Sequence, residues 1–379
     1  MNTFDIAVFK DIFTIGSGEN FIELNNTVGQ RWFVPYRHNG LFLSLFQPSS
    51  VKGKLFAKSI NWIKFYPMLL GIANARIVKL TFSKPFMDYA NKVFDMQYCQ
   101  FGIFCGSPGF HQKITIMAAN KDRVMGYCKI TDKKNILTLF DNEFNNLKYL
   151  QFRGVCHIPT PLFCGELPFA NLYAFFQTTE RNGKVKYANY RSQEVLDFIK
   201  DLNNRTKLDI PFHNSDFAHS LIRLRKNLIF INDNKMKKTF ADGVNLIENN
   251  KECFKLFCAS HGDLTAWNSF IVDKHLFAFD LEYFKKSNPL LCDFFHFFTQ
   301  DLLYNGYADS DKIYREYLNV KNTLPEVRHL DYLYIAYLLV IVDFYLNRDK
   351  GILNERLGSC FAIWSELIKR LMNNVKEIY

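Results

Sequence analysis

Two hydrophobic patterns divide the chain. Up to about residue 180, short apolar and aromatic runs alternate with turns rich in Gly, Pro, Asn and Ser, a pattern typical of strands. From about residue 184, apolar residues recur every three or four positions over long stretches, which is typical of amphipathic helices. The sequence therefore predicts an α+β protein, with a strand-rich part followed by a helical part.

The strand-rich part is predicted to contain two regions. Residues 1–92 form an N-terminal extension of unassigned role, with strands at 32–35 and 41–46 and a mostly helical stretch from 52 to 67. Residues 93–180 form a β-rich domain, with strands at about 100–104, 113–118, 124–130, 158–163 and 170–178. Phe140, Phe144, Leu147 and Leu150 recur at helical spacing, so a helix follows the third of these strands.

Residues 181–379 are predicted to form a helical domain. Its helices are expected at 192–202, 217–228, 244–257, 289–303, 311–317, 331–346 and 355–375. A hairpin interrupts the series, because the apolar runs 269–272 and 276–279 are joined by a turn at 273–275. The antiparallel return brings Asn268 and Asp280 to the open end of the hairpin, where facing residues lie roughly 5 Å apart.

Composition indicates a folded cytoplasmic protein. The 379 residues are 48% hydrophobic and 16% aromatic, which is enough for more than one core. The nine cysteines are scattered and lack a Cys-x-x-Cys pair, which favours reduced thiols over a disulfide scaffold or a zinc site. The start lacks a signal-peptide pattern, and the apolar run 332–342 is too short to span a bilayer, so we expect a buried helix there.

The net charge of +10 is concentrated in two places. Residues 1–90 contain ten Lys or Arg against five Asp or Glu, and a second basic cluster lies at 223–238. Most basic faces are simply solvated, and the functional interpretations are an anionic substrate or peripheral contact with an anionic membrane surface. Nucleic acid is not expected, because no zinc finger, recognition helix or aromatic RNA-binding signature accompanies the charge.

Candidate chemistry gathers around the hairpin. His261-Gly262-Asp263 precedes it, Asn268 opens it, and Asp280 and Glu282 follow it. Each residue alone is an ordinary polar group of a turn. Together, Asp263 and Asn268 keep the D-x-x-x-x-N spacing of the kinase catalytic loop, and Asp280 falls where the metal-binding Asp of that template follows.

Three features upstream are candidates for nucleotide binding. Lys129 ends the third strand of the β-rich domain, where a cation can neutralise inner phosphates, and Glu143 lies on the following helix, where it can hold that lysine. Gly106 and Gly109 lie in a small turn with free amides, although Pro108 removes one donor. The backbone around Gln177, before a polar connection, is predicted to read the edge of the base.

These residues resemble the aminoglycoside phosphotransferase and choline kinase branch of the protein-kinase-like superfamily. The resemblance covers about residues 98–300 and is most specific over 259–284, where Gly262 and the Asp-x-Glu of 280–282 point to the small-molecule branch. It implies a bilobal fold and the use of Mg²⁺ with ATP, with GTP left open. Three departures are the short turn with Pro108, Ala266 where the family often has Pro, and residues 1–92, which have no counterpart.

The resemblance also implies a role for each residue. Asp263 would be the catalytic base, and Asn268 and Asp280 would be magnesium ligands, with Glu282 a further ligand through water. Lys129 would hold the α- and β-phosphates and Glu143 would fix Lys129. His261 would shape the loop, and Asp293 would brace it.

The predicted function is phosphorylation of a hydroxyl on a small molecule or a saccharide, such as a sugar of a bacterial surface polysaccharide. An antibiotic-modifying kinase is a second interpretation, although cationic aminoglycosides favour acidic sites and the cluster at 223–238 is basic. A catalytically inactive binding or regulatory protein is a third. A protein kinase is less favoured, because residues 282–289 are too few for a long peptide-docking loop.

Overall fold

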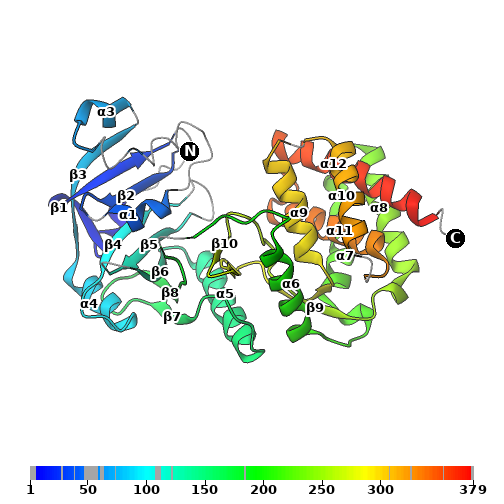
Figure 1. Ribbon diagram of the computed structural model, residues 1–379, viewed down its shortest axis with the longest axis horizontal. Coiled ribbons are helices and arrows are strands. Elements are labelled where there is room, and N and C mark those ends of the chain that lie inside the picture. The colour runs from blue at the N-terminus through cyan, green and yellow to red at the C-terminus, as the bar shows by residue number, and fades with distance from the viewer. Residues whose placement is uncertain are drawn as a thin grey trace. The chain divides into compact units, whose positions relative to one another are not determined.

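The computed structural model describes the chain except residues 1–5, 27–28, 38, 47–58, 60–63, 73, 107–111, 121–122, 183–184, 307, 325–326, 353 and 377–379. The chain forms two compact units. Unit 1 comprises Met1–Phe152 and Cys156–Lys186, and unit 2 comprises Arg153–Val155 and Tyr187–Tyr379. Strands dominate unit 1 and helices dominate unit 2, so the predicted α+β class is confirmed (Figure 1).

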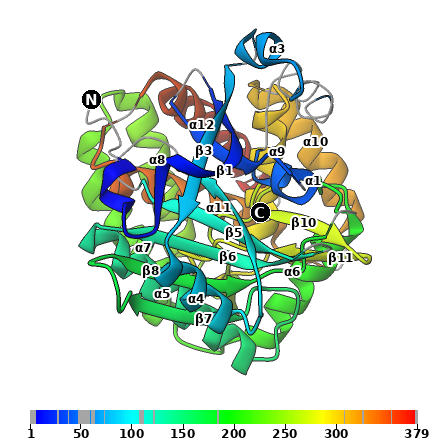
Figure 2. The ribbon, with the colours of Figure 1, turned by 90° about the vertical axis from the view of Figure 1, so that its left-hand side faces the viewer.

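Unit 1 is built on one antiparallel sheet, which Figure 2 shows from one side. Its strand order is β3-β1-β2-β4-β5-β6-β8-β7. The strands are β1 (Phe13–Asn25), β2 (Arg31–Pro35), β3 (Ala75–Phe82), β4 (Gln100–Phe104), β5 (Ile114–Ala119), β6 (Val124–Thr131), β7 (Pro161–Glu166) and β8 (Tyr173–Thr178). The predicted strands at 100–104, 113–118 and 124–130 match to within one residue, while β7 and β8 each start three residues later than predicted.

The sheet buries apolar side chains on both faces. Residues that are neighbours in a strand belong to different core clusters, as strand alternation requires. One cluster contains Phe21 and Ile116, and the other contains the next residues, Ile22 and Met117. The strands within residues 1–92 contribute to both clusters and pair directly with β4 through β2. The residues that we predicted to form a separate extension are therefore part of the same sheet as the rest of unit 1.

Helices cover this sheet. They are η1 (Ile6–Phe9), α1 (Asn39–Phe42), η2 (Leu43–Leu45), α3 (Pro67–Ile72), α4 (Lys84–Val93) and α5 (Lys134–Phe152). The strand predicted at 41–46 is wrong, because α1 and η2 occupy it. Helical turns put Phe42 and its apolar neighbours against the sheet together, whereas a strand would turn every second side chain away. Most of the helix predicted at 52–67 lies outside the described residues.

Unit 2 consists mostly of helices and also contains two short strand pairs (Figure 1). The helices are α6 (Gln193–Thr206), η3 (Phe212–Asn214), α7 (Asp216–Asn227), η4 (Leu228–Phe230), α8 (Asn234–Asn249), η5 (Lys251–Cys253), α9 (Cys292–Tyr304), α10 (Ser310–Thr323), α11 (Leu330–Arg348) and α12 (Glu355–Lys376). The strands β9 (Phe257–Ser260) and β12 (Lys285–Pro289) pair antiparallel, as do β10 (Ser269–Val272) and β11 (His275–Ala278).

The largest boundary error in unit 2 concerns α8. We predicted this helix over 244–257, and the structure ends it at Asn249 and begins it at Asn234. Asp233 explains the start, because its carboxylate accepts the backbone N–H groups of Lys235 and Met236 at 2.8 and 3.0 Å. The missed strand β9 uses the end of the predicted range and leads directly into the His261 loop.

Helix α11 contains the apolar run that we predicted to be buried. By length and composition alone it could cross a membrane, but 78% of its most hydrophobic window is buried inside the protein. It packs against α7, α9 and α12 of unit 2. A helix that is apolar on all sides and enclosed by other helices is a core helix, which agrees with the prediction.

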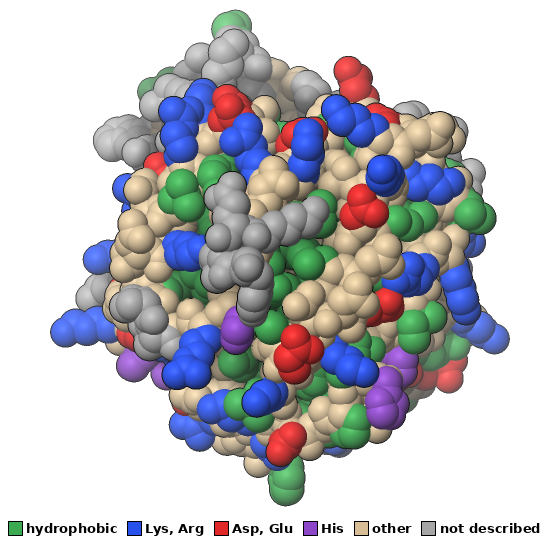
Figure 3. Space-filling model, turned by 90° about the vertical axis from the view of Figure 1, so that its right-hand side faces the viewer, with side chains coloured by type: hydrophobic (Ala, Val, Ile, Leu, Met, Phe, Trp, Pro, Cys, Tyr) green, Lys and Arg blue, Asp and Glu red, His purple; other side chains and the backbone are tan. Residues whose placement is uncertain are grey.

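Basic side chains are dispersed over the face of the molecule that Figure 3 shows. Figure 3 shows Lys and Arg side chains spread among acidic and apolar ones over one face of the molecule. In the predicted basic cluster at 223–238, Arg223 is paired with Asp343 and Arg225 with Glu248. The cluster is thus partly neutralised within the protein.

Candidate active site

The hairpin that opens the candidate site has a fixed register. Ser269 pairs with Ala278 and Val272 with His275, so the turn is Asp273-Lys274 alone and His275 belongs to β11. Both turn residues have positive φ, at 47° and 66°, as a two-residue hairpin turn requires. At the open end, the Phe279 amide donates to the carbonyl of Asn268 at 3.0 Å. Asn268 therefore lies opposite Phe279, the residue that precedes Asp280.

Gly262 is required by the backbone of the preceding loop. Its φ is +85°, and a Cβ atom there would lie 2.3 Å from the carbonyl oxygen of Tyr283. Any other residue would therefore push the loop away from the segment that follows the hairpin. The close approach keeps Asp263 next to the strand ends.

Asp293, at the start of α9, accepts two backbone hydrogen bonds from this loop. Its Oδ2 is 2.7 Å from the His261 nitrogen and its Oδ1 is 3.1 Å from the Gly262 nitrogen. Burial raises the pKa of the Asp293 carboxyl, while His261 and the two amides act in the opposite direction. The contacts are those expected of the bracing residue that the resemblance implied.

The His261 ring ties the loop to the hairpin. Its Nδ1 accepts from the Asp263 amide at 3.3 Å, so its Nε2 carries the proton and donates to the Phe279 carbonyl at 2.9 Å. Both ring nitrogens are engaged in holding backbone. This contact pattern fits the loop-shaping role predicted for His261.

Asp263 and Asn268 form the centre of the site. The Asn268 amide nitrogen donates to Asp263 Oδ2 at 2.8 Å and to the Asp263 carbonyl at 3.0 Å. The other carboxylate oxygen, Oδ1, is 3.1 Å from Nε2 of His296. The Asp263 side chain is held on two sides and is still 33% exposed, so its carboxylate can meet a molecule from solvent.

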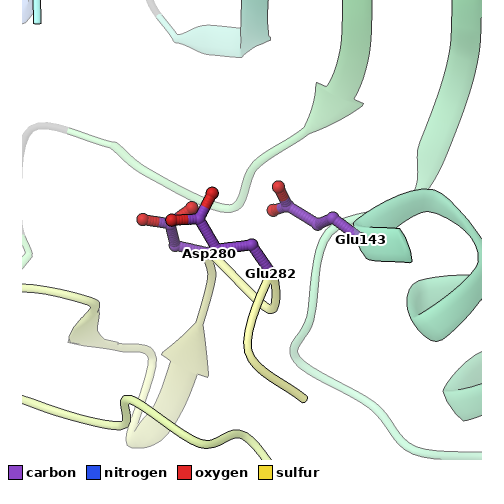
Figure 4. A group of neighbouring side chains, drawn as sticks. All are labelled: Glu143, Asp280 and Glu282. Atoms are coloured by element: carbon purple, nitrogen blue, oxygen red, sulfur yellow. The ribbon is translucent and has the colours of Figure 1, made fainter. Parts of the chain in front are cut away.

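Asp280 and Glu282 lie on the loop after β11. Figure 4 shows their carboxylates next to each other, and carboxylate oxygens of the two residues lie within 4.8 Å of one another. Asp280 has a φ of 72°, an unfavourable left-handed conformation for a residue with a side chain. Carboxylate oxygens this close together can bind one cation jointly.

In unit 1, Lys129 and Glu143 meet as predicted. Lys129 Nζ is 2.6 Å from Glu143 Oε2, and the two side chains are 7% and 0% exposed. Lys129 is in register with Phe175 of β8, and its ammonium lies 5.6 Å from the centre of that ring. Helix α5 packs on the same strand through Phe140 and Phe144, which brings Glu143 to the lysine.

The other residues predicted to bind the nucleotide are Gly106, Gly109 and Gln177. Gly106 has a φ of +73°, and a Cβ atom there would lie 2.3 Å from the Lys113 carbonyl oxygen, so only glycine fits against the backbone of Lys113. Gly109 lies outside the described residues.

Gln177 is 2% exposed and pairs with Tyr127 on one side and Pro161 on the other. Because β8 is an interior strand here, its backbone is engaged in the sheet, which argues against the predicted reading of a base by 175–178.

Sequence reasoning missed His296. It lies three residues after Asp293 on α9 and therefore on the same helix face. That spacing was an available signal, but the surrounding Phe294, Phe295, Phe297 and Phe298 give this segment the pattern of an ordinary core helix. They are indeed buried, and so is the histidine among them.

Comparison with known proteins gives a likeness at the level of fold. No family model matches the chain, and no curated protein matches it. Among solved structures, aminoglycoside phosphotransferase APH(4)-Ia is similar with a TM-score of 0.49 and 9% identity, over 75% of this chain and 98% of that chain. Choline kinase LicA from Streptococcus pneumoniae gives 0.45 and 13%, over 76% and 98%.

A third solved structure is the amicoumacin kinase hAmiN in complex with AMP-PNP, Ca²⁺ and Ami, with a TM-score of 0.43, 12% identity and coverage of 72% and 88%. The first two of these three proteins carry the names of the families that the sequence resembles. Such distant likenesses say nothing about the roles of individual residues. Those roles have to be inferred from the contacts of this chain.

Proposed function

We propose that this protein is an ATP- and magnesium-dependent kinase that transfers a phosphoryl group to a hydroxyl of a small molecule or a saccharide. The observation that supports this best is the hydrogen-bonded Asp263–Asn268 pair, followed by the adjacent carboxylates of Asp280 and Glu282. Phosphoryl transfer needs little covalent help from the protein, so positioned charges of this kind supply most of the rate.

Asp263 is the proposed catalytic base. Its carboxylate is oriented by Asn268 and His296 and remains partly exposed. A hydroxyl that donates to this carboxylate is oriented for attack on the phosphorus, and its proton passes to Asp263 as the new P–O bond forms and the bond to ADP breaks. The proton then leaves to solvent from the exposed side.

The residues around Asp263 fit a magnesium site. Asn268 donates both amide hydrogens to Asp263, so its Oδ1 is left as a ligand for a cation. Asp280 and Glu282 add carboxylate oxygens, and oxygen donors are what Mg²⁺ prefers. When bound, the metal would supply positive charge to the phosphate oxygens of the nucleotide.

Lys129 is proposed to neutralise the inner phosphates of the nucleotide. Its ion pair with Glu143 fixes the ammonium in position before any ligand arrives, which lowers the entropy lost on binding. Gly106 follows β4 and lies against the backbone of Lys113, which precedes β5. The base would be read by residues beyond Thr178, where β8 ends.

A neutral acceptor, such as a saccharide, suits the tyrosine and arginine side chains near Asp263 in unit 2. Burial raises the pKa of Tyr345 to about 12, with a further contribution from the Asp263 carboxylate. The Arg348 guanidinium lies 4.6 Å from the centre of the Tyr345 ring and is paired with Asp349. Tyrosine and arginine side chains suit the hydroxyls and ring faces of a sugar better than the ammonium groups of an aminoglycoside.

The nine cysteines all lie within the described residues and form no disulfide, which supports a reducing, cytoplasmic location for this activity. The test is to incubate the purified protein with γ-labelled ATP, Mg²⁺ and a broad panel of sugars and other alcohols. We expect label in an acid-stable phosphate ester with the wild type and none with Asp263→Ala. Nucleotide binding without transfer to any acceptor or to water would favour the inactive binding protein instead.

A further inference from the structure

His296 contacts the proposed catalytic base although no motif includes it. Its Nε2 lies 3.1 Å from Asp263 Oδ1, and its side chain is 4% exposed. It sits about one turn after Asp293 on α9. One helix therefore supports the loop at two points: Asp293 holds the backbone at 261–262, and His296 reaches the carboxylate itself.

The hydrogen-bonding partners of His296 define its protons. Nε2 of His296 donates to Asp263 Oδ1, and in the Nε2–H tautomer the lone pair of the ring lies at Nδ1. That nitrogen lies 3.4 Å from the hydroxyl of Tyr337. Burial holds the pKa of Tyr337 well above its usual value, so the hydroxyl keeps its proton and can donate it to Nδ1.

Aromatic packing fixes the plane of the His296 ring. Tyr337 of α11 lies edge-on to it, with ring centres 5.8 Å apart, and stacks on Tyr334 at 6.2 Å. Tyr334 in turn stacks on Phe295 of α9 at 4.6 Å, and its hydroxyl is 3.1 Å from that of Thr299. A ring held this way presents Nε2 to Asp263 in one orientation, because neither α9 nor α11 leaves it room to turn.

We propose that His296 is a positioning residue that fixes the Asp263 carboxylate for phosphoryl transfer, an inference that rests on the proposed function. Asn268 holds one carboxylate oxygen and His296 holds the other, so rotation about the Asp263 side chain is blocked from both sides. His296 is not a proton shuttle, because its other nitrogen contacts Tyr337, which is 1% exposed and offers no route to solvent.

Two substitutions separate positioning from packing. His296→Gln keeps an N–H donor close to the place of Nε2, whereas His296→Met has a similar volume without a donor. We expect His296→Met to lower kcat for labelled phosphate transfer, to an acceptor or to water, by about 10- to 100-fold, the effect of losing one hydrogen bond to a charged group. His296→Gln should recover most of it, and KM for ATP should change less than threefold in both.

Tyr337→Phe is the matched control within the same chain of contacts. It removes only the hydroxyl facing Nδ1 and leaves the bond to Asp263 in place, so kcat should fall by no more than about threefold. Thermal unfolding of all three variants shows whether each is folded. Equal kcat for folded His296→Met, His296→Gln and wild type would overturn the inference, as would equal losses in His296→Met and His296→Gln.

A measurement without turnover separates this inference from the proposed function. In protein labelled with ¹⁵N-histidine, His296 is assigned by the signal missing in His296→Gln. We expect the Nε2–H tautomer, and a shift of that resonance in Asp263→Ala without a comparable shift of the other histidines except His261. An unshifted resonance overturns the inference even if the enzyme is active. If the resonance shifts but the protein transfers no phosphate to any acceptor or to water, the contact between His296 and Asp263 is real. The proposed function has then failed, and with it the catalytic role of the contact.

Discussion

The Lys129–Glu143 pair of unit 1 and the Asp263 loop of unit 2 use charge in opposite ways. The pair places two opposite charges 2.6 Å apart and buries both almost completely. The loop gathers carboxylates of the same sign, and Asp263 is a third exposed. The charges of the first arrangement balance each other without a ligand, whereas the second offers several oxygen ligands to a cation.

This difference suggests a division of labour. A buried, preformed ion pair offers a fixed ammonium group, so it contributes to the binding of phosphates. A partly exposed loop of acidic and amide oxygens is suited to hold a metal and to receive a proton, so its contribution is to the transfer step. Substitutions in the two units should therefore change different quantities.

The largest effect is expected from Asp263→Ala. Removing the base should lower kcat by about 10³-fold, within the usual range for a general base, while nucleotide affinity changes little. Labelled transfer and nucleotide binding by calorimetry measure the two quantities. Asp201→Ala is the control, because Asp201 carries an exposed carboxylate paired only with neighbouring Arg205 on α6 among the contacts described. A transfer rate in Asp263→Ala within tenfold of the wild type would contradict the assignment.

The next largest effect concerns Lys129 and Glu143. Lys129→Met leaves the Glu143 carboxylate buried without its ammonium partner, which should destabilise the protein by about 3–5 kcal/mol and raise the dissociation constant for ATP about 100-fold. The double variant Lys129→Met, Glu143→Leu removes both charges. It should recover most of the free energy of unfolding in urea and none of the affinity for ATP.

If the double variant recovered ATP binding together with stability, the pair would be structural and not part of the nucleotide site. Arg223 and Asp343 supply the comparison within unit 2, since Asp343 is also a buried carboxylate with a basic partner. Removing that pair should change stability alone.

Local sequence patterns were sufficient for the hairpin and for the loop. The two-residue turn at 273–274 and the alternation of β10 and β11 are short-range features, so the placement of Asn268 could be predicted from them. Lys129 and Glu143 were within reach because one strand and one helix, consecutive in the chain, carry them. In each case the partners are close in sequence.

Contacts between distant segments could not be predicted in this way. His296 reaches Asp263 from 33 residues away, and only the packing of α9 against α11 sets the angle of its ring. The union of residues 1–92 with the main sheet depends on the pairing of β2 with β4, for which no short-range signal exists. The strand predicted at 41–46 failed for the same reason, since the surface that Phe42 covers is formed by other strands.

A smaller effect is expected from Gly262→Ala. The added Cβ would meet the Tyr283 carbonyl at 2.3 Å in a backbone with a φ of +85°. Relieving the clash should cost about 2–4 kcal/mol and shift the loop, lowering kcat by about tenfold with little change in ATP affinity. Gly358→Ala on α12 is the matched control, because no described atom outside its own stretch of helix lies within 4 Å of its Cβ position, and it should raise stability by up to about 1 kcal/mol. Equal kcat in both variants would show that the loop tolerates displacement.

The smallest effect on transfer is expected from Asp343→Asn, which should leave kcat within twofold of the wild type and change only the pH dependence of stability. Burial raises the pKa of the Asp343 carboxyl to about 6, despite the opposing charge of Arg223. The folded protein therefore holds this proton more tightly than the unfolded chain, whose carboxyl has an ordinary pKa near 4.

The sign of this pH dependence follows from the raised pKa. The stability that Asp343 contributes is fully present below about pH 4, is lost as the pH rises to about 6, and stays constant above that. Asparagine does not titrate, so the free energy of unfolding of the wild type minus that of Asp343→Asn should fall by up to about 3 kcal/mol across this window. Urea unfolding at pH 4, 5, 6 and 7 measures the difference. If the difference in free energy of unfolding rises with pH, the charge of Arg223 affects the pKa of Asp343 more than burial does. This pair would then resemble the Lys129–Glu143 pair.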